Sequence, residues 1–184
     1  MVGLSGRGVE TLVLGADHEP RRVDRAAAAA QGDRDPWVSV PTQDPGRVAD
    51  RLQEHGLSTA VVPEWLMSTP LEAQRRVPLP DGCTARLRWR EDRVVDLRVL
   101  APDGGLAASG QLGLAGPHGV PDRIETAPAH RRRGLGGAVM TALADAALEH
   151  GATEGVLVAS QAGRGLYLRL GWEQVGAVVI GRLL

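Results

Sequence analysis

The segment between residues 122 and 150 constrains the fold of this chain most, because three local patterns follow one another there. A strand pattern covers Asp122–Thr126, the loop 130–137 reads His-Arg-Arg-Arg-Gly-Leu-Gly-Gly, and a helix pattern continues to about His150. The first turn of a helix has unpaired backbone N–H groups and a partial positive charge, and glycines let an anion approach the backbone closely. The segment therefore predicts a binding site for a phosphorylated ligand.

Two other phosphate-binding motifs do not fit this loop. A Walker loop requires Gly-Lys-Ser or Gly-Lys-Thr, and the chain contains no lysine. A dinucleotide-binding turn requires G-x-G-x-x-G after a strand, and the glycines here are spaced differently. A further alternative is that Arg131–Arg133 form an exposed basic patch, for nucleic acid or for solvent only. This alternative leaves the flanking strand and the glycines unexplained.

The spacing within the segment resembles that of the GCN5-related N-acetyltransferase (GNAT) family. Thr126-Ala127-Pro128 followed by Arg131-x-x-Gly134-x-Gly136 matches the family pattern V-x-P-x-x-R-x-x-G-x-G, with threonine in place of valine. About thirty residues further on, the run 165–172, Gly-Leu-Tyr-Leu-Arg-Leu-Gly-Trp, is similar to the family's L-Y-x-x-L-G-F motif. The resemblance covers about residues 83–184. It implies an α/β (α+β) fold, with a mixed, mostly antiparallel central sheet flanked by helices and a pyrophosphate loop between strand four and helix three.

The resemblance also implies transfer of an acetyl group from acetyl-coenzyme A (acetyl-CoA) to an amine, and it implies which residues bind acetyl-CoA. In the family the loop amides hold the pyrophosphate, strand four pairs with the pantetheine arm, and an asparagine seven residues before the tyrosine holds that arm. Ser160 has this last place here and keeps a hydroxyl group. The residues expected at the cofactor are Ile124, Glu125, Thr126, Arg131, Arg132, Arg133, Gly134, Leu135, Gly136, Gly137, Ser160 and Tyr167.

The chemistry implied by the family requires both a base and an acid. An alkyl amine must lose a proton before it attacks the thioester, and the departing thiolate is better released as a thiol. Tyr167, the only tyrosine of the chain, stands where the family has its tyrosine and is the candidate acid. The alternative is a buried tyrosine with a structural role only.

Two carboxylates on the predicted strand 122–126 are candidates for the base. The two-residue period of a strand places Asp122 and Glu125 on opposite faces, so that only one of them would reach the substrate. Glu125 would point toward the acceptor if Ile124 and Thr126 face the helix, and we slightly favour Glu125 over Asp122 as the base. Asp122 matches the place of a glutamate in some polyamine-acetylating relatives. Two alternatives are equally open. A chain of water molecules could take up the proton without a carboxylate, or the carboxylates could serve only in surface salt bridges to Arg123.

Composition and charge limit the other classes of function. The chain has 184 residues, 43% of them hydrophobic and 23% charged, which predicts one full core with at most a small appended segment. A net charge of −1 offers no overall attraction to nucleic acid or to an anionic membrane. All 21 basic residues are arginine, which indicates a codon bias and weakens arguments from arginine counts. We therefore expect acetyl-CoA and an amine acceptor as partners, without nucleic acid or membrane, and the oligomeric state stays open, a homodimer included.

The sequence also predicts the compartment and the absence of a metal. Cys83 is the only cysteine, so no disulfide can form within the chain, and there is no signal peptide or apolar run of about 18 residues. These features favour a cytoplasmic protein. The five histidines are scattered without ligand spacing, and we expect no metal site.

We divide the chain into an N-terminal segment (1–34), a helical and extended part (35–82) and a GNAT-like acyl-CoA-binding domain (83–184). The first segment is either a loosely ordered leader or a strand at Glu10–Leu14 followed by a helix that Asp24 caps. The second begins with a strand at Trp37–Val40 and a helix from Asp44 to about His55. The apolar run 61–67, which contains Trp65, lines an acceptor pocket or, more simply, packs in the core or forms part of a helix pair.

The third part departs from the family pattern at one place. Three β-rich runs joined by short turns predict hairpins, whereas the family has two helices between its first two strands. Either residues 35–75 supply these helices or the acceptor side is built differently. The elements expected in this part are strands at Cys83–Arg90, Val94–Leu100, Leu106–Leu114, Asp122–Thr126, Gly155–Ala159 and Gln174–Ile180, and helices at about Gly134–His150 and Gly163–Leu170.

Three functions are compatible with these observations. The first is an acetyl-CoA-dependent N-acetyltransferase that acts on a small molecule or a protein amine. The second is a non-catalytic module that binds or senses acyl-CoA. The third is a protein-interaction module that uses residues 1–75, with an exposed patch around Trp65.

Overall fold

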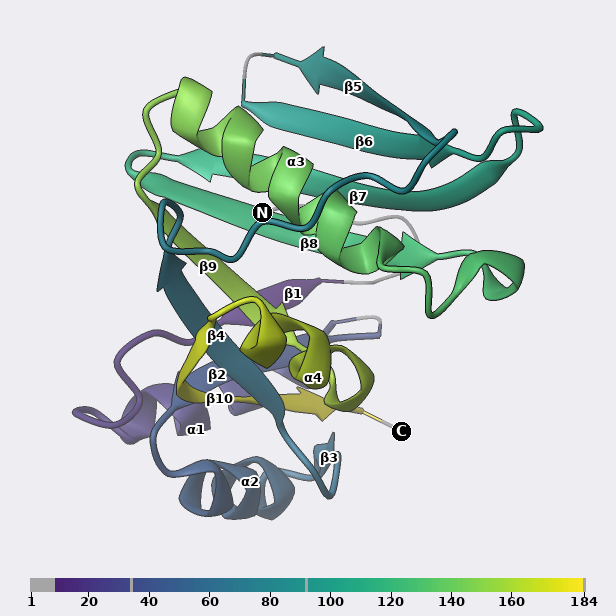
Figure 1. Ribbon diagram of the computed structural model, residues 1–184. Coiled ribbons are helices and arrows are strands. Elements are labelled where there is room, and N and C mark those ends of the chain that lie inside the picture. The colour runs from purple at the N-terminus through teal and green to yellow at the C-terminus, as the bar shows by residue number, and fades with distance from the viewer. Residues whose placement is uncertain (1–8, 34, 92, 184) are drawn as a thin grey trace. The chain divides into compact units, whose positions relative to one another are not determined.

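The computed structural model describes residues 9–33, 35–91 and 93–183, and the chain forms two compact units. Residues 1–66 and 174–184 make the first unit, and residues 67–173 make the second. The first eight residues of the expected N-terminal segment lie outside the described residues. Figure 1 shows the elements of both units in chain order.

The first unit contains a small group of strands and two helices. Strand β2 pairs in parallel with β1, and β10 pairs in antiparallel fashion with β2 and β3. Fully buried valines and leucines, among them Val38, Val40 and Leu52, form its core. The elements are β1 (Glu10–Leu12), α1 (Arg21–Ala30), β2 (Trp37–Thr42), α2 (Pro45–Glu54), β3 (Ser58–Thr59) and β10 (Glu173–Arg182).

Helix α2 begins and ends as predicted. The side chain of Asp44 accepts a hydrogen bond from the backbone N–H of Arg47 at 3.1 Å, and Pro45 is the first helical residue. Gly56, at φ +78°, has the left-handed conformation that a residue just past a helix end commonly takes. Local sequence signals therefore account for this helix.

Helix α1 corrects the expectation for the N-terminal segment. Its first residue is Arg21, so Asp24 lies in the first turn and is not the cap. The Asp24 carboxylate instead accepts hydrogen bonds from the guanidinium group of Arg51 on α2, at 2.7 and 2.8 Å. Val23, Ala27 and Ala30 are buried. Of the two readings of this segment, a packed helix is confirmed for residues 21–30.

The second unit has the mixed, mostly antiparallel sheet that was predicted, with helices packed on it. Strands β5, β6, β7 and β8 pair in antiparallel fashion, β9 runs parallel to β8, and β4 lies beside β9 (Figure 1). The elements are β4 (Glu64–Pro70, of which residues 67–70 belong to this unit), β5 (Thr84–Arg90), β6 (Val94–Leu100), β7 (Leu106–Ala115), β8 (His118–Thr126), the 3₁₀ turn η1 (Pro128–His130), α3 (Leu135–Glu149), β9 (Glu154–Ala159) and α4 (Gln161–Arg169).

The apolar run 61–67 is mostly a strand and not part of a helix pair. Strand β4 contains Trp65, which is half-buried, and Met67, which is fully buried. The run is too short for its periodicity to separate a strand from a helix, and this explains why the helix pair was wrong. The burial of Met67 agrees with the other reading, core packing. Val61 and Val62, just before β4, are exposed.

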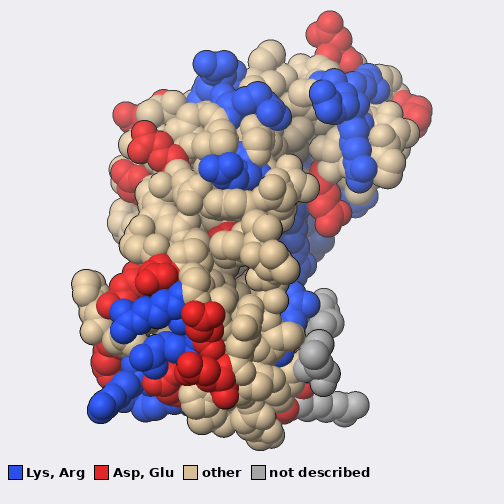
Figure 2. Space-filling view, turned by 90° about the horizontal axis from the view of Figure 1, so that it is seen from below, with Lys and Arg blue, Asp and Glu red and all other residues tan. Residues whose placement is uncertain are grey.

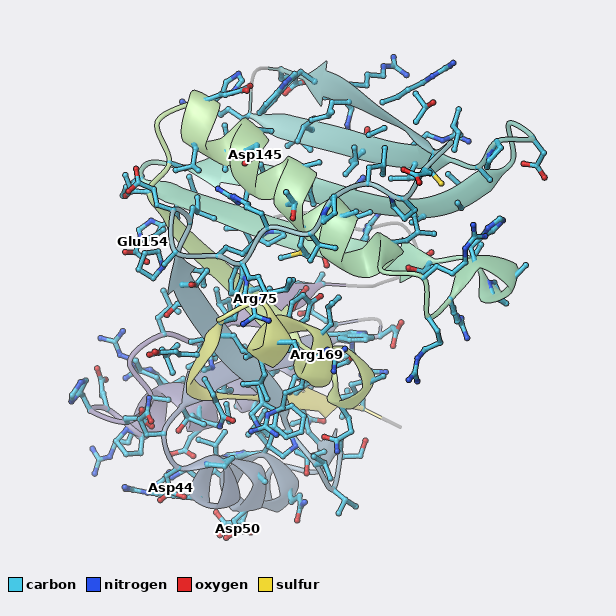
Figure 3. The ribbon with its side chains drawn as sticks, viewed as in Figure 1. Asp44, Asp50, Arg75, Asp145, Glu154 and Arg169 are labelled. Atoms are coloured by element: carbon cyan, nitrogen blue, oxygen red, sulfur yellow. The ribbon has the colours of Figure 1, made fainter. Side chains whose placement is uncertain are left out.

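The segment 71–83 runs along α3 without forming a helix, and β5 follows it directly. The amide of Gln74 donates to the carbonyl oxygen of Met140 at 3.0 Å, and the N–H of Val77 donates to the hydroxyl of Thr141 at 2.9 Å. An ion pair of 3.2 Å joins Arg76 to Asp145, which Figure 3 labels on α3. Residues 35–83, all of which the structure describes, thus contain one helix, α2, whereas the family resemblance implied two.

Helix α3 packs on the sheet through the side chains that its periodicity predicted. Leu135, Val139, Leu143 and Ala147 are all nearly inaccessible and belong to one core with the apolar side chains of β6 and β7. The helix ends before Gly151, at φ +82°. This packing holds the first turn of α3 at the end of β8.

Candidate functional site

A cleft opens in the second unit where β8 and β9 stop pairing. The two strands pair in parallel only at their first residues, His118 with Glu154 and Gly119 with Gly155. The later part of β8, up to Thr126, lines a cleft of about 1140 Å³ instead. The rest of its wall comes from the first residues of β7, the loop after η1, the start of α3 and the helix α4.

A β-bulge lies in the part of β8 that lines the cleft. Ser109 pairs with Glu125 and Gln111 pairs with Asp122, so the single residue Gly110 faces two residues of β8. One of these two is Arg123, which has a φ of +52°. The bulge inserts one extra residue into β8 and shifts the alternation of its side chains.

The bulge corrects the prediction that the two candidate carboxylates lie on opposite faces. Ser109 and Gln111 are two residues apart and share a face of β7, so their partners Glu125 and Asp122 share the same face of β8. Ile124 lies on the other face, because its Cδ1 atom would be 2.8 Å from a Cβ atom at Gly110 and it packs with the core under α3. Both carboxylates therefore point away from α3.

The two carboxylates differ in their surroundings. Glu125 lines the cleft and is exposed, and among the described residues it has no ion pair. Asp122 does not line the cleft; it accepts a hydrogen bond from the N–H of Arg123 at 2.8 Å and lies 3.8 Å from the Arg123 side chain. The salt bridge to Arg123 that the sequence left open is thus present at Asp122 only.

The loop after η1 forms the predicted turn into α3. Gly134, at φ +80°, is the residue before the helix and takes a left-handed conformation that favours glycine. Ala138 is the first residue whose N–H bonds back into the helix, to the carbonyl oxygen of Gly134 at 3.0 Å. By helix geometry the N–H groups of residues 135–137 are left without an intrahelical acceptor, and these residues line the cleft.

The three arginines of this loop have different places. Arg131 and Arg132 line the cleft, and the guanidinium group of Arg131 donates to the carbonyl oxygen of Thr126 at 3.2 Å. Arg133 does not line the cleft, and its side chain lies 3.2 Å from Nδ1 of His130. Two of the three guanidinium groups therefore lie where they can meet an anion at the start of α3.

Close packing explains the two glycines in the first turn of α3. A Cβ atom at Gly136 would lie 3.1 Å from Cδ2 of Leu166, and one at Gly137 would lie 2.8 Å from Cγ2 of Val77. Gly136 thus lets α3 approach α4, whereas Gly137 admits the segment that runs along α3. A side chain at position 136 would project into the space that the cleft and Leu166 share.

Helix α4 brings Ser160 and Tyr167 to the cleft. The Ser160 hydroxyl oxygen caps the helix by accepting a hydrogen bond from the N–H of Gly163 at 3.2 Å, and its proton stays available to a ligand. The ring of Tyr167 lies over Gly163, where a Cβ atom would be 3.2 Å from Cε2. Burial raises the pKa of Tyr167, and the negative charge of Asp122 raises it further. The hydroxyl therefore stays protonated at neutral pH.

A buried hydrogen-bonded chain supports the end of α4. The N–H of Trp172 donates to the carbonyl oxygen of Tyr167 at 3.0 Å, and the indole N–H donates to the side-chain oxygen of Gln74 at 2.9 Å. Trp172 and Gln74 are both 2% exposed. The series of hydrogen bonds continues from Gln74 to Met140 on α3. It therefore connects α4 to the helix whose first turn lines the cleft.

All residues predicted at the cofactor line the cleft, except Arg133. The sequence did not predict the contribution of the start of β7, because contact with β7 depends on strand pairing and not on the motif. It also missed Arg169, which Figure 3 labels on α4 and whose guanidinium group lies 3.5 Å from a Cβ atom built at Gly165. The missed lining residues are Leu106, Ala107, Ala108, Ser109, Ala127, Pro128, Ala162, Gly163, Leu166 and Arg169.

Charge is distributed in small clusters. Figure 2 shows arginine and acidic side chains interspersed on the face that it presents, in agreement with a net charge of −1.

Among the described residues no three metal-ligating side chains gather into a group that could hold an ion. No helix in the described part of the chain is long and apolar enough to cross a membrane.

Comparison with known proteins identifies the family. Residues 60–172 match the model of the acetyltransferase (GNAT) family, and this span is more than half of the chain. The protein belongs to the GNAT acetyltransferase family. No curated protein matches the chain.

Several solved structures share the fold at low sequence identity. A GCN5-related N-acetyltransferase from Kribbella flavida is 20% identical with a TM-score of 0.67, over 97% of this chain and 79% of that one. Another from Sphaerobacter thermophilus is 18% identical with a TM-score of 0.61, over 80% of this chain and 59% of that one. A tandem GNAT protein from the clavulanic acid biosynthesis pathway is 12% identical with a TM-score of 0.62, over 92% of this chain and 70% of that one. These identities support a likeness of fold only.

Proposed function

We propose that this protein is an acetyl-CoA-dependent N-acetyltransferase that transfers an acetyl group to an amine. The observation that carries the proposal is the cleft where β8 and β9 stop pairing. The first turn of α3 and Tyr167 both line this cleft. Unpaired backbone amides at a helix start can donate hydrogen bonds to a pyrophosphate, and a buried hydroxyl can donate a proton to the sulfur that leaves. Membership of the GNAT family gives the proposal its chemistry.

The cleft offers acetyl-CoA a continuous set of contacts. We assign the pyrophosphate to the N–H groups of residues 135–137, with Arg131 and Arg132 adding charge. The backbone of Ile124–Thr126 offers N–H and C=O groups to the amide groups of pantetheine, because β9 does not pair with that stretch of β8. Ser160 contributes its hydroxyl proton.

The proposed reaction is a direct transfer. The neutral amine nitrogen attacks the thioester carbonyl carbon, the C–N bond forms, and the C–S bond breaks. Glu125 is the proposed acceptor of the ammonium proton, through water where needed, because its carboxylate lines the cleft and has no cationic partner among the described residues. Tyr167 is the proposed donor of a proton to the departing thiolate, since its raised pKa keeps it protonated. The proton that the nitrogen loses as the amide forms then restores the phenol.

Calorimetric titration with acetyl-CoA tests the proposal. We expect the parent protein to bind and Gly136→Glu to lose binding, because the new carboxylate projects toward the phosphates. Gly113→Glu is the matched control: it adds the same charge to β7 at a position with no atom within 4 Å of its Cβ, and it should bind like the parent. Circular dichroism establishes that both variants are folded. Absence of binding in the parent would refute the proposal.

Turnover separates the enzyme from an acyl-CoA sensor. Release of coenzyme A in the presence of a panel of amines, with detection of the acetylated amine by mass spectrometry, supports the enzyme. Tight binding without turnover on any amine would favour the sensor. A cytoplasmic location stays a prediction from the sequence, which leaves the oligomeric state open, a homodimer included.

A further inference from the structure

The strands of the second unit carry two polar rows on one face of the sheet. Residues paired across neighbouring strands point to the same side, so each chain of pairings forms a row. The first row consists of Arg86, Arg98, Ser109 and Glu125, and the second of Arg88, Asp96, Gln111 and Asp122.

These rows lie on the face away from α3. Gly110, which alternates with Ser109 and Gln111 on β7, faces the side chains of Val139 and Leu143 from α3. Figure 1 shows α3 packed along one side of β6, β7 and β8. On the other side, a groove of about 790 Å³ is lined by polar residues of both rows.

The β5–β6 end of the groove is positive. Arg86 and Arg98 are paired directly across the two strands, and both are exposed. Neither has an ion pair among the described residues. Like charges placed opposite each other across strands are destabilising, and an anion between them would relieve the repulsion. A guanidinium pair in this arrangement also offers several N–H donors to a carboxylate or phosphate.

Nearby acidic groups do not neutralise this end. Asp96 is the closest carboxylate in the pairing scheme, in the neighbouring row. It already accepts from the amide of Gln111 at 2.6 Å and pairs with Arg90 at 2.9 Å. The charge of Asp96 is therefore engaged, and the guanidinium groups of Arg86 and Arg98 keep a net positive charge around them.

The opposite end of the first row is negative and opens into the acetyl-CoA cleft. Glu125 and Ser109 line both the groove and the cleft, so the groove reaches the proposed site of transfer. Glu125 is two strands away from Arg98, and strands lie about 4.8 Å apart, so the two Cα atoms are roughly 10 Å from each other. The row thus presents a negative end at the cleft and a positive end about two strands away.

We infer that the acceptor is an amine that also carries a carboxylate or phosphate group, with this anion held between Arg86 and Arg98 and the amine directed to Glu125. The inference rests on the proposed function, since it names the acceptor of the same reaction. A molecule with its charges in this order matches the row at both ends, whereas an acceptor with a second positive charge would meet repulsion at β5 and β6. The polar centre of the row, at Ser109, suits the stem of such a molecule.

Steady-state kinetics with matched acceptors tests the inference. Linear ω-amino carboxylates of increasing length are compared with their carboxamides, which lack only the charge, and with ω-aminoalkyl phosphates. We expect kcat/KM to be at least about tenfold higher for the anionic acceptors than for the carboxamides, because only the anions can form charge-assisted bidentate hydrogen bonds with the arginines. The relative rates of carboxylates and phosphates then show which anion the site prefers.

Variants of the arginine pair locate the effect. Arg98→Gln and Arg86→Gln should each lower kcat/KM for the anionic acceptors by about 10-fold or more and leave the carboxamides nearly unchanged. Arg93→Gln, at an exposed arginine of the turn between β5 and β6 outside the groove, is the control and should behave like the parent. Calorimetry should show the same affinity for acetyl-CoA in all of these proteins.

The outcomes separate this inference from the proposed function. Acetylation of carboxylates and carboxamides at equal rates would overturn the inference and leave the acetyltransferase intact. A preference for anions that survives both arginine substitutions would overturn it as well. Failure of the parent to bind acetyl-CoA would remove the proposed function and the inference together. If acetyl-CoA binds without turnover, the inference is tested by titrating the coenzyme A-saturated protein with the amino carboxylates. Binding of an amino carboxylate that does not depend on Arg86 and Arg98 would then overturn the inference.

Discussion

The carboxylate of Asp122, on β8, raises the pKa of Tyr167, on α4, in addition to the larger effect of burial. The two residues are far apart in the sequence, and the parting of β8 and β9 brings their elements to the same cleft. Raising the pKa of a phenol keeps it neutral and able to donate its proton. The relationship therefore joins one of the two candidate carboxylates to the candidate acid.

The first prediction concerns the hydroxyl of Tyr167. Tyr167→Phe keeps the ring that packs over Gly163 and removes the proton donor. We expect kcat to fall by about 100-fold, in the usual range for loss of a general acid, with unchanged affinity for acetyl-CoA. Stopped assays of coenzyme A release and calorimetry measure the two quantities. An unchanged kcat would show that Tyr167 has only a structural role.

The second prediction concerns the effect of Asp122 on pH dependence. Removing its negative charge in Asp122→Asn lowers the pKa of Tyr167 toward its usual value, because a nearby negative charge disfavours the tyrosinate. Activity that needs the protonated tyrosine is lost when pH rises through this pKa. The alkaline limb of the kcat profile should therefore move to lower pH in the variant. A limb that stays in place, or moves to higher pH, would contradict the assignment of the acid.

The third prediction separates the two carboxylates as bases. Glu125→Gln should lower kcat/KM at neutral pH by about 100-fold, because an alkyl ammonium then has no group to take its proton. The loss should shrink as pH approaches the pKa of the amine, where free amine is present without a base. Asp122→Asn should show no such recovery at high pH. Equal losses at all pH values would indicate that Glu125 acts by binding the substrate and not as a base.

The fourth prediction concerns the packing under the bulge. A Cβ atom at Gly110 would lie 2.8 Å from both Cδ1 of Ile124 and Cγ1 of Val139, so Gly110→Ala overpacks the core. We expect a loss of about 1–3 kcal/mol in the free energy of unfolding. Gly113→Ala, on the same strand with no atom within 4 Å, is the control and should change the stability little. Urea denaturation followed by circular dichroism measures both variants, and equal stabilities would mean that the bulge region repacks without strain.

Much of the cofactor side was predictable because its determinants are local. The glycine before α3 and the apolar period of α3 act within a few residues of the chain. The cap at Asp44 and the end of α2 at Gly56 follow from the same kind of signal. The cofactor residues themselves were implied by the family resemblance, and apart from Arg133 they line one cleft.

The faces of the two carboxylates could not be predicted because they depend on pairing between strands. The two-residue period holds for a regular strand, and nothing in the run Asp122–Thr126 announces the extra residue of the bulge. The same limit applies to β4, whose short apolar run has no period that separates strand from helix. The start of α1 was also misplaced, because Asp24 pairs with Arg51 of another helix and does not cap its own.

The sequence by itself determined that this chain has a strand, a glycine-rich loop and a helix suited to an anion, followed by a tyrosine on a second helix. These properties come from backbone preferences and from periodicity, which act between near neighbours. Only the tertiary structure decided that Asp122 and Glu125 share a face, that arginines of β5 and β6 stand in the same rows, and that the groove they line meets the cleft. The physical reason is that strand register is a relation between distant segments, and it is set by which side chains of β6, β7 and β8 pack against α3.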